Sequence, residues 1–84
     1  MFESEICKEI INVSTLGAKQ LGLKSVEKIL VCVSPFFNFD KQLIQYFFEL
    51  GTVGSALSGA KIEFIVDERI TNCKKVYVKN LRGV

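Results

Sequence analysis

The chain has 84 residues, of which 49% are hydrophobic and 24% charged, and its formal net charge is +2. This length gives room for one hydrophobic core, and the composition and short apolar runs exclude disordered, collagen-like and membrane-spanning classes. The small net charge does not indicate a polyanionic partner. We therefore expect one domain over residues 1–84. Acidic residues near the start, where a signal peptide is basic, favour the cytoplasm.

Three cysteines and the absence of histidine limit the chemistry that this sequence can support. Cys7, Cys32 and Cys73 are far apart and form no Cys-x-x-Cys pair, so we expect reduced thiols and neither a disulfide framework nor a zinc knuckle. Cys73 is either incidental or a reactive, intermolecular thiol. Without histidine, the commonest metal ligand and general base are both missing. No nucleophile and base pair, phosphate-cradling glycine loop or paired-carboxylate motif is present, so we do not expect an enzyme.

Residues 4–22 have the pattern of an amphipathic helix, because apolar side chains recur at intervals of three and four with charged residues between them. Glu3 and Glu5 near its start and Lys19 near its end suit the helix dipole. Gly22 is expected to end the helix in the left-handed conformation.

Residues 26–34 form a largely apolar, β-branched run that is too short for a buried helix and predicts the central strand. Alternate side chains on one face of this strand are apolar: Ile29, Val31 and Val33.

Residues 34–39 form a connection that leads to Asp40, a residue type preferred at a helix N-cap. The apolar residues that follow have the spacing of a second helix: Leu43, Ile44, Phe47, Phe48 and Leu50. We expect this helix to end between Gly51 and Gly54.

Residues 61–67 and 74–81 alternate as half-buried strands do. Five of their side chains are expected to face the helices: Ile62, Phe64, Val66, Val76 and Val78. Because these strands are consecutive, we expect them to form an adjacent antiparallel hairpin. The order α-β-α-β-β then predicts an α+β fold, a two-layer sandwich with two helices on one face of a three-stranded sheet.

The opposite face of this sheet is also expected to carry apolar side chains. We call them the outer patch: Leu30, Cys32, Ile65 and Tyr77. An apolar stripe that helices do not cover indicates an interface, either between copies of this chain or with a protein partner. Free strand edges would offer a second route to pairing. The alternative is a partly covered face on which these residues have no role.

Three phenylalanines in the connection before the second helix allow two interpretations. Phe36, Phe37 and Phe39 could stack on single-stranded nucleic acid if basic side chains lay beside them, and the basic candidates are Lys75, Lys79 and Arg82. No recognisable RNA-binding motif accompanies them. We therefore expect the phenylalanines to close the end of the core, and we expect neither a nucleic-acid nor a membrane partner.

Several local motifs resemble the HypA family, whose members deliver nickel during maturation of hydrogenase and, in some organisms, urease. Family members begin Met-His-Glu-x-Ser-[Leu/Ile]-Cys, and this chain begins Met1-Phe2-Glu3-Ser4-Glu5-Ile6-Cys7. Further elements that match the family, over nearly the whole chain, are Val26 to Ser34, Asp40, Phe48-Glu49, Gly54-Ser55 and Ser58-Gly59-Ala60. The resemblance implies a role linked to nickel-enzyme maturation.

The chain departs from the family pattern at two places. The resemblance implies nickel binding by the terminal amine, backbone amides and the imidazole of residue 2, which here is Phe2. The family's zinc module, with two Cys-x-x-Cys pairs before the last strand, is replaced by a short turn that contains Cys73 alone. We expect an accessory, protein-interaction role with nickel binding lost, no zinc and no other cofactor. The alternative is a residual nickel chaperone, for which the weak ligand candidates are Met1, Glu3 and Asp40.

Overall fold

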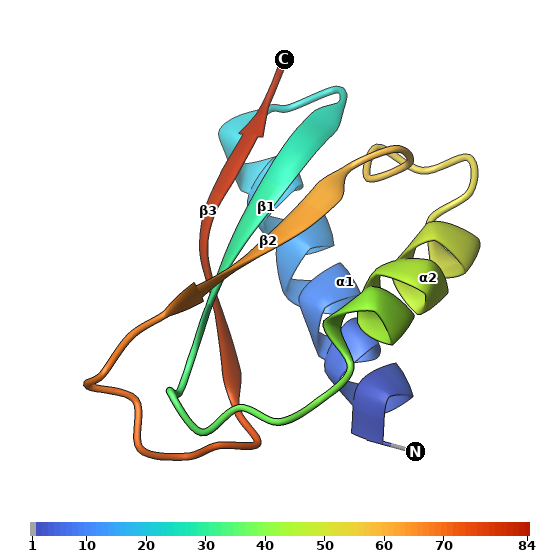
Figure 1. Ribbon diagram of the computed structural model, residues 1–84. Helices are drawn as coiled ribbons and strands as arrows, with labels where there is room; N and C mark the ends of the chain where they lie inside the picture. The colour runs from blue at the N-terminus through green and yellow to red at the C-terminus, as the bar shows by residue number, and fades with distance from the viewer. Residues whose placement is uncertain (1) are drawn as a thin grey trace.

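The computed structural model describes residues 2–84 and contains two helices and three strands (Figure 1). The elements are α1 (Phe2–Leu21), β1 (Val26–Val33), α2 (Lys41–Gly51), β2 (Lys61–Val66) and β3 (Val76–Gly83). The predicted order α-β-α-β-β is confirmed. The predicted bounds differ at the ends, since α1 starts at Phe2 and β3 extends to Gly83.

The three strands form one sheet in the order β2-β1-β3. Strand β1 is central, as predicted, and pairs in parallel with β2 and antiparallel with β3. The predicted hairpin between the last two strands is therefore wrong, because β2 and β3 lie on opposite sides of β1. The apolar β1 gains a partner along both edges in this arrangement, and the connection over residues 67–75 is long enough to cross the end of the sheet.

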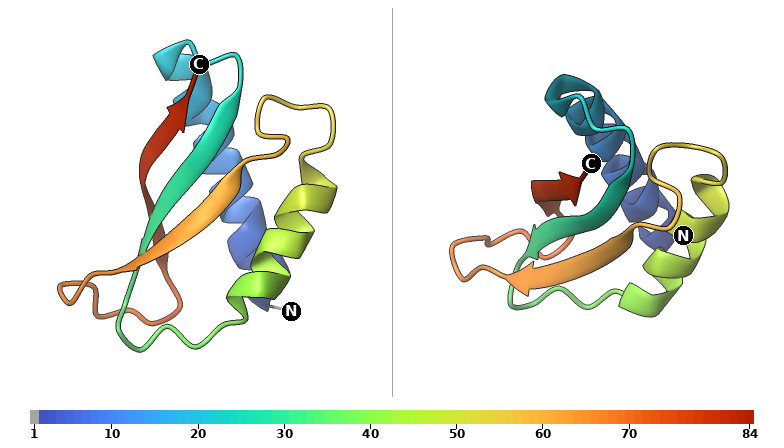
Figure 2. Two further views of the ribbon diagram at one scale, coloured as in Figure 1. Left: turned by 45° about the horizontal axis from the view of Figure 1, so that its top comes forward. Right: turned by 90° about the horizontal axis from the view of Figure 1, so that it is seen from above.

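Both helices lie on the same face of the sheet, which confirms the predicted two-layer sandwich (Figure 2). Helix α1 packs beside α2 and along β3, whereas α2 lies nearer β2. The core between the layers contains the three β1 side chains predicted to face the helices, all fully buried: Ile29, Val31 and Val33. Val66 was predicted to face inward but is exposed, because the end of edge strand β2 extends past the helices (Figure 1).

Helix α1 ends in the predicted manner. Gly22 has φ of 69°, and its N–H donates to the carbonyl of Lys19 at 3.2 Å. The next N–H, of Leu23, donates to the carbonyl of Ala18 at 2.9 Å. These two bonds satisfy carbonyl groups of the last turn and turn the chain toward β1.

A β-bulge in β3 changes which side chains face α1. Leu30 is opposite Asn80, and Val31 is opposite Val78, so Lys79 is an extra residue in the ladder.

Downstream of the bulge, Leu81 packs against α1 at Gly17. A Cβ atom on Gly17 would lie 2.9 Å from Cδ1 of Leu81. Glycine at this position therefore allows the close approach of β3 to the helix.

The free edge of β2 is occupied at its start by a side chain of α2. The N–H of Ile62 donates to Oε1 of Gln45 at 2.9 Å, and Nε2 of Gln45 donates to the carbonyl of Ala60 at 3.2 Å. The Gln45 amide thus bonds to this edge as a neighbouring strand would.

Candidate functional site

The first turns of α1 and α2 meet at one end of the molecule, where two of the predicted ligand candidates come together. Asp40 is the N-cap of α2, as predicted, and its side chain accepts a hydrogen bond from the N–H of Leu43 at 3.0 Å. The backbone N–H of Asp40 in turn donates to Oε2 of Glu3 at 3.2 Å. Both carboxylates thus satisfy donors at the start of α2.

This pair of hydrogen bonds resembles a capping box whose two acceptors come from different helices. In a capping box the third helical residue is Glu or Gln and bonds back to the N-cap N–H. That position in α2 is Leu43, which cannot accept such a bond, and Glu3 of α1 supplies the carboxylate instead. Met1, the third ligand candidate, lies outside the described residues.

Phe2 belongs to a row of aromatic rings. Its ring centroid lies 5.8 Å from that of Phe39, which packs edge-on against Phe37 at 5.2 Å. Phe37 stacks on Phe64 of β2 at 5.8 Å. The Nζ atom of Lys74 lies over the ring of Phe2, 5.3 Å from its centroid, within range of a cation–π contact.

The prediction that the three phenylalanines of the connection close the core is confirmed for two of them. Phe37 and Phe39 are partly buried and pack against the core cluster, so neither forms an open stacking platform. Phe36 points away from the core and is exposed.

Carboxylate and thiol groups are dispersed over the described chain. Among residues 2–84, no three Cys, Asp or Glu side chains gather as a metal-binding cluster. No helix in that range is long and apolar enough to cross a membrane.

The outer patch is located on the sheet face opposite the helices, and three of its four members are in register. Cys32 of β1 is aligned with Ile65 of β2 on one side and with Tyr77 of β3 on the other. Tyr77 is 49% exposed, whereas Cys32 is only 8% exposed. A hollow beside Cys32 and Tyr77 is bordered by Ile70 of the connection between β2 and β3. The accessible part of the patch is therefore its Tyr77 side.

A salt bridge fixes the start of that connection. Arg69 Nη2 lies 2.9 Å from Oδ2 of Asp67, and the guanidinium and the backbone N–H of Arg69 both donate to this carboxylate. The hydrogen bonds from Arg69 lower the pKa of Asp67 to about 2.

Comparison with known proteins gives this geometry a context. A family model described as "Hydrogenase/urease nickel incorporation, metallochaperone, hypA" matches residues 1–79. The chain belongs to the HypA family. The resemblance inferred from the sequence motifs is thereby confirmed.

Two relatives show how much of a HypA protein this chain covers. It is 28% identical over 74 residues to "Hydrogenase maturation factor HypA" of Francisella philomiragia subsp. philomiragia, a match that covers 88% of this chain and 65% of the relative. The chain thus spans about two thirds of that relative's length. The solution structure of the Ni metallochaperone HypA from Helicobacter pylori superposes with a TM-score of 0.64 at 18% identity and shows the same fold. That match covers 93% of this chain and 70% of the other.

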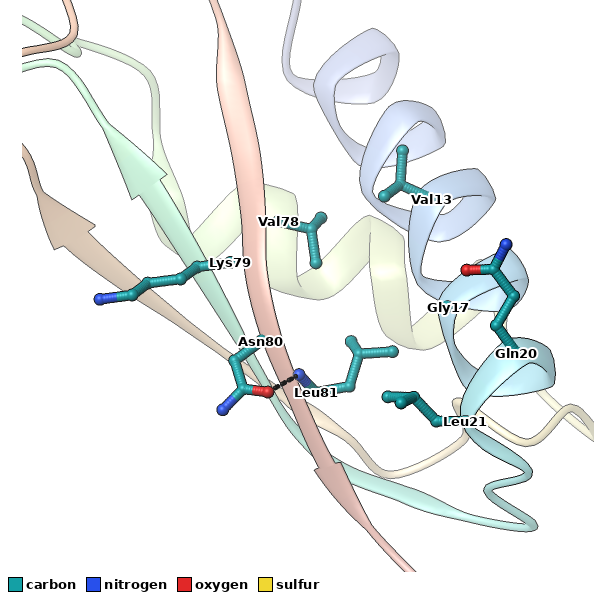
Figure 3. A pocket seen from close by; sticks show the side chains of 8 residues that line it. All are labelled: Val13, Gly17, Gln20, Leu21, Val78, Lys79, Asn80 and Leu81. Atoms are coloured by element: carbon teal, nitrogen blue, oxygen red, sulfur yellow. Dashed lines mark hydrogen bonds between the residues drawn. The ribbon is translucent and has the colours of Figure 1, made fainter.

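One surface of this HypA-family chain was not foreseen from the sequence. A cleft lies between α1 and the helix-facing side of β3 (Figure 3). Its lining residues are Val13, Gly17, Gln20, Leu21, Val78, Lys79, Asn80 and Leu81. The available signal was the number of apolar residues in α1, of which Val13, Leu16 and Leu21 remain exposed.

Proposed function

We propose that residues 1–84 act as one accessory, protein-interaction domain in hydrogenase maturation, with nickel binding at the amino terminus lost. The family description names nickel incorporation, and the Francisella relative is named a hydrogenase maturation factor. This chain spans only 65% of that relative. Its own role is therefore inferred from the residues that it retains.

The observation that carries this proposal is the position of Phe2. Its ring packs on Phe39, and it offers no lone pair to a metal. Nickel(II) favours nitrogen-rich, tetragonal coordination, for which a phenyl ring in place of an imidazole removes a principal ligand. The neighbouring carboxylate of Glu3 already accepts a hydrogen bond from Asp40. These contacts support a structural rather than a metal-binding role for both side chains.

The charge next to Phe2 also opposes a bound cation. The Lys74 ammonium lies 5.3 Å from the centre of the Phe2 ring. A divalent ion at about 5 Å from an ammonium group is repelled by on the order of 1–2 kcal/mol even in a water-like medium. Lys74 therefore adds an electrostatic cost to the loss of the nitrogen ligand.

A calorimetric titration of nickel into the protein with its native Met1 tests this proposal. We expect no saturable uptake by the native chain and uptake of about one equivalent by Phe2→His, which restores the family residue. Phe2→Leu is the matched control, since it alters the ring without adding a ligand. Uptake by Phe2→Leu as well would mean that the ring, not a missing ligand, blocks the site.

The second candidate function is a residual nickel metallochaperone. It is favoured by the proximity of Glu3 and Asp40, which places two carboxylates at one end of the molecule. Under this alternative the native chain binds one equivalent tightly and Glu3→Ala abolishes binding. Those two results together would lead us to conclude that the chain is a residual nickel metallochaperone and not an accessory domain.

For the accessory role we propose self-association through the outer patch. Lys28 and Glu63 form an ion pair at 3.5 Å on the neighbouring strands β1 and β2. This pair supplies both signs of charge near the patch, so two copies of the face can meet there without a repulsion between like charges alone. Tyr77, the patch residue with the largest exposed fraction, would be the centre of this contact.

A further inference from the structure

The start of the β2 edge already binds an amide group. The Gln45 side chain is hydrogen-bonded to Ala60 and Ile62 there, and its Nε2 also donates to Oε2 of Glu49 at 3.0 Å. This amide occupies the place that a peptide group of a neighbouring strand would take. The edge can therefore bind amide groups in the manner of a β-ladder.

The end of the same edge has free backbone groups. Backbone groups of successive strand residues point to alternate sides. The N–H of Ile62 points to the free edge, whereas that of Asp67 points to β1 and donates to the carbonyl of Val33 at 2.9 Å. By this alternation the N–H and C=O groups of Phe64 and Val66 point to the free edge. No side chain or loop within residues 2–84 is hydrogen-bonded to them.

So short a free edge favours a partner strand that is already ordered. Two donors and two acceptors yield little net stability in water, whereas ordering a flexible segment costs conformational entropy at every residue. A preformed strand with the same two outward-facing residues avoids that cost. The β2 strand of a second copy is such a strand.

The Gln45 contact also selects how two β2 strands can pair. In an antiparallel pair, residues that exchange both hydrogen bonds must both face the shared edge. Pairing Phe64 with Val66 of the second copy, and Val66 with its Phe64, leaves the Ile62 N–H to Gln45. Pairing Phe64 with its own equivalent would bring Ile62 opposite Val66 of the second copy, where Gln45 already bonds. The two-fold axis therefore passes beside Ile65.

The side chains of β2 suit this register. Val66 is 56% exposed, because β2 extends past the helices (Figure 1), and Phe64 of the second copy would lie directly across from it. On the outer face the two Ile65 side chains would meet, each in line with Cys32 of its own copy. Cross-strand pairs of aromatic and β-branched side chains stabilise a sheet. The exposed Val66 is thereby covered.

The helices leave space for this arrangement. Helix α2 lies near the start of β2, where Gln45 contacts Ala60 and Ile62. Both views of Figure 2 show the end of β2 directed away from α2. Because the two strands run in opposite directions from Ile65, the two α2 helices lie on opposite sides of the axis, each beside the start of its own strand.

One contact between the copies involves like charges. Glu63 would lie across from Asp67 of the second copy on the outer face. Both carboxylates already have a basic partner, Lys28 at 3.5 Å and Arg69 at 2.9 Å. The groups that meet are therefore two ion pairs rather than two isolated carboxylates.

We propose that the end of β2 pairs with the end of β2 in a second copy of this chain, antiparallel and centred on Ile65. The pairing joins two three-stranded sheets into one continuous sheet. This inference goes beyond the proposed function, because it uses the strand edge and requires neither the amino terminus nor Tyr77.

Disulfide cross-linking tests the register. Ile65→Cys places a cysteine at the two-fold axis, in a non-hydrogen-bonded pair whose Cα atoms are about 4.5 Å apart. Mild oxidation of this variant should give a covalent dimer. Glu63→Cys is the matched control on the same face, because its two copies would lie about 13 Å apart along the strands, too far for a disulfide. Both variants also carry Cys73→Ser, which removes an exposed thiol.

Two results of this cross-linking overturn the proposal. One is equal cross-linking of the Ile65→Cys and Glu63→Cys variants. The other is no cross-linking of Ile65→Cys at protein concentrations up to about 1 mM. Adding Tyr77→Glu to Ile65→Cys should leave the cross-link in place, because the outer patch is a separate contact. Loss of the cross-link in that combination would assign it to the outer patch and also overturn the edge pairing.

A proline at the edge tests the hydrogen bonds. Val66→Pro removes one N–H from each copy but keeps the ladder with β1, because this N–H points to the free edge. The dissociation constant, measured by analytical ultracentrifugation, should rise by about tenfold or more. Val66→Thr keeps the N–H and the branched side chain and should have the smaller effect. A dissociation constant that Val66→Pro leaves unchanged, or that both variants raise equally, overturns the proposal.

Amide hydrogen exchange gives a readout that needs no variant. The N–H groups of Phe64 and Val66 should exchange more slowly as the protein concentration rises, because pairing protects them. The N–H of Ile65 faces β1 and serves as the internal control, protected at every concentration. Exchange at Phe64 and Val66 that does not depend on concentration overturns the proposal. Neither nickel binding nor a contact through the outer patch protects these two groups, so the proposals fail separately.

Discussion

Glu3 of α1 accepts a hydrogen bond from the backbone N–H of Asp40 at 3.2 Å and so joins the starts of the two helices. The carboxylate at residue 3 therefore has a structural use in a chain whose residue 2 is phenylalanine. An unpaired N–H at a helix start is costly when it loses water. Helix capping thus gives both Glu3 and Asp40 a structural role.

The N-cap of α2 provides a stability prediction. Asp40→Ala removes the acceptor for the Leu43 N–H and should lower the free energy of unfolding by about 1 kcal/mol. Asp40→Asn keeps an oxygen acceptor and should stay within a few tenths of a kcal/mol of the native value. Urea unfolding followed by circular dichroism measures both. Equal losses for the two variants would mean that the charge at residue 40, rather than its cap, stabilises the helix.

The residue that ends α1 provides a second stability prediction. Gly22 has φ of 69°, a conformation that costs a residue with a Cβ about 1–2 kcal/mol. Gly22→Ala should therefore destabilise the fold by about that amount, and Gly22→Asn by less, because asparagine tolerates this region better. Thermal unfolding of both variants measures the difference. A Gly22→Ala protein as stable as the native chain would contradict the left-handed cap.

The outer patch predicts the state of association. Tyr77→Glu should dissociate an oligomer that contacts through this face, because it places a charge at the most exposed patch residue. The control is Tyr46→Glu, which changes a tyrosine of similar exposure on α2, away from the patch. Light scattering coupled to size exclusion gives the mass of each protein. The proposal fails if the mass of Tyr77→Glu equals that of the native chain, or if both variants dissociate.

The Asp67–Arg69 pair predicts that the stability of the fold depends on pH in the acid range. The pKa of Asp67 is lowered to about 2 by hydrogen bonds from Arg69. This folded-state pKa lies below the unfolded value. The contribution of the pair to folding stability is therefore present above about pH 4 and is lost as the pH falls to about 2. Arg69→Ala removes the side-chain hydrogen bonds but keeps the backbone N–H of residue 69, so it should raise the Asp67 pKa part of the way to its ordinary range, measured by carboxyl carbon NMR. An unchanged titration in that variant would contradict the assigned cause.

Local signals in the sequence predicted the elements well. Gly22 and Asp40 mark helix ends through chemistry within a few residues, and β1 is recognisable from its own apolar run. The HypA motifs spread along the chain were sufficient to indicate the family. Strand pairing was not predictable in this way, because β2 and β3 have similar alternation and either could lie beside the other or beside β1.

The features missed by sequence reasoning depend on distant contacts. Glu3 and Asp40 are 37 residues apart, and only the packing of α1 against α2 brings them together. The cleft depends on the bulge at Lys79, which returns Leu81 to the helix face. A strict alternation of side chains cannot reveal such a bulge. The burial expected for Val66 was wrong for a different reason, because alternation does not show that the end of β2 extends past the helices (Figure 1).

The Gln45 amide, which bonds to Ile62 and Ala60, limits how this protein can polymerise. A sheet with a bare edge can recruit further chains one strand at a time, in the geometry of a fibril. Because its own helix occupies the start of this edge, another strand can pair with Ala60 and Ile62 only after Gln45 is displaced. The Gln45 contact therefore opposes growth of the sheet at the start of the β2 edge.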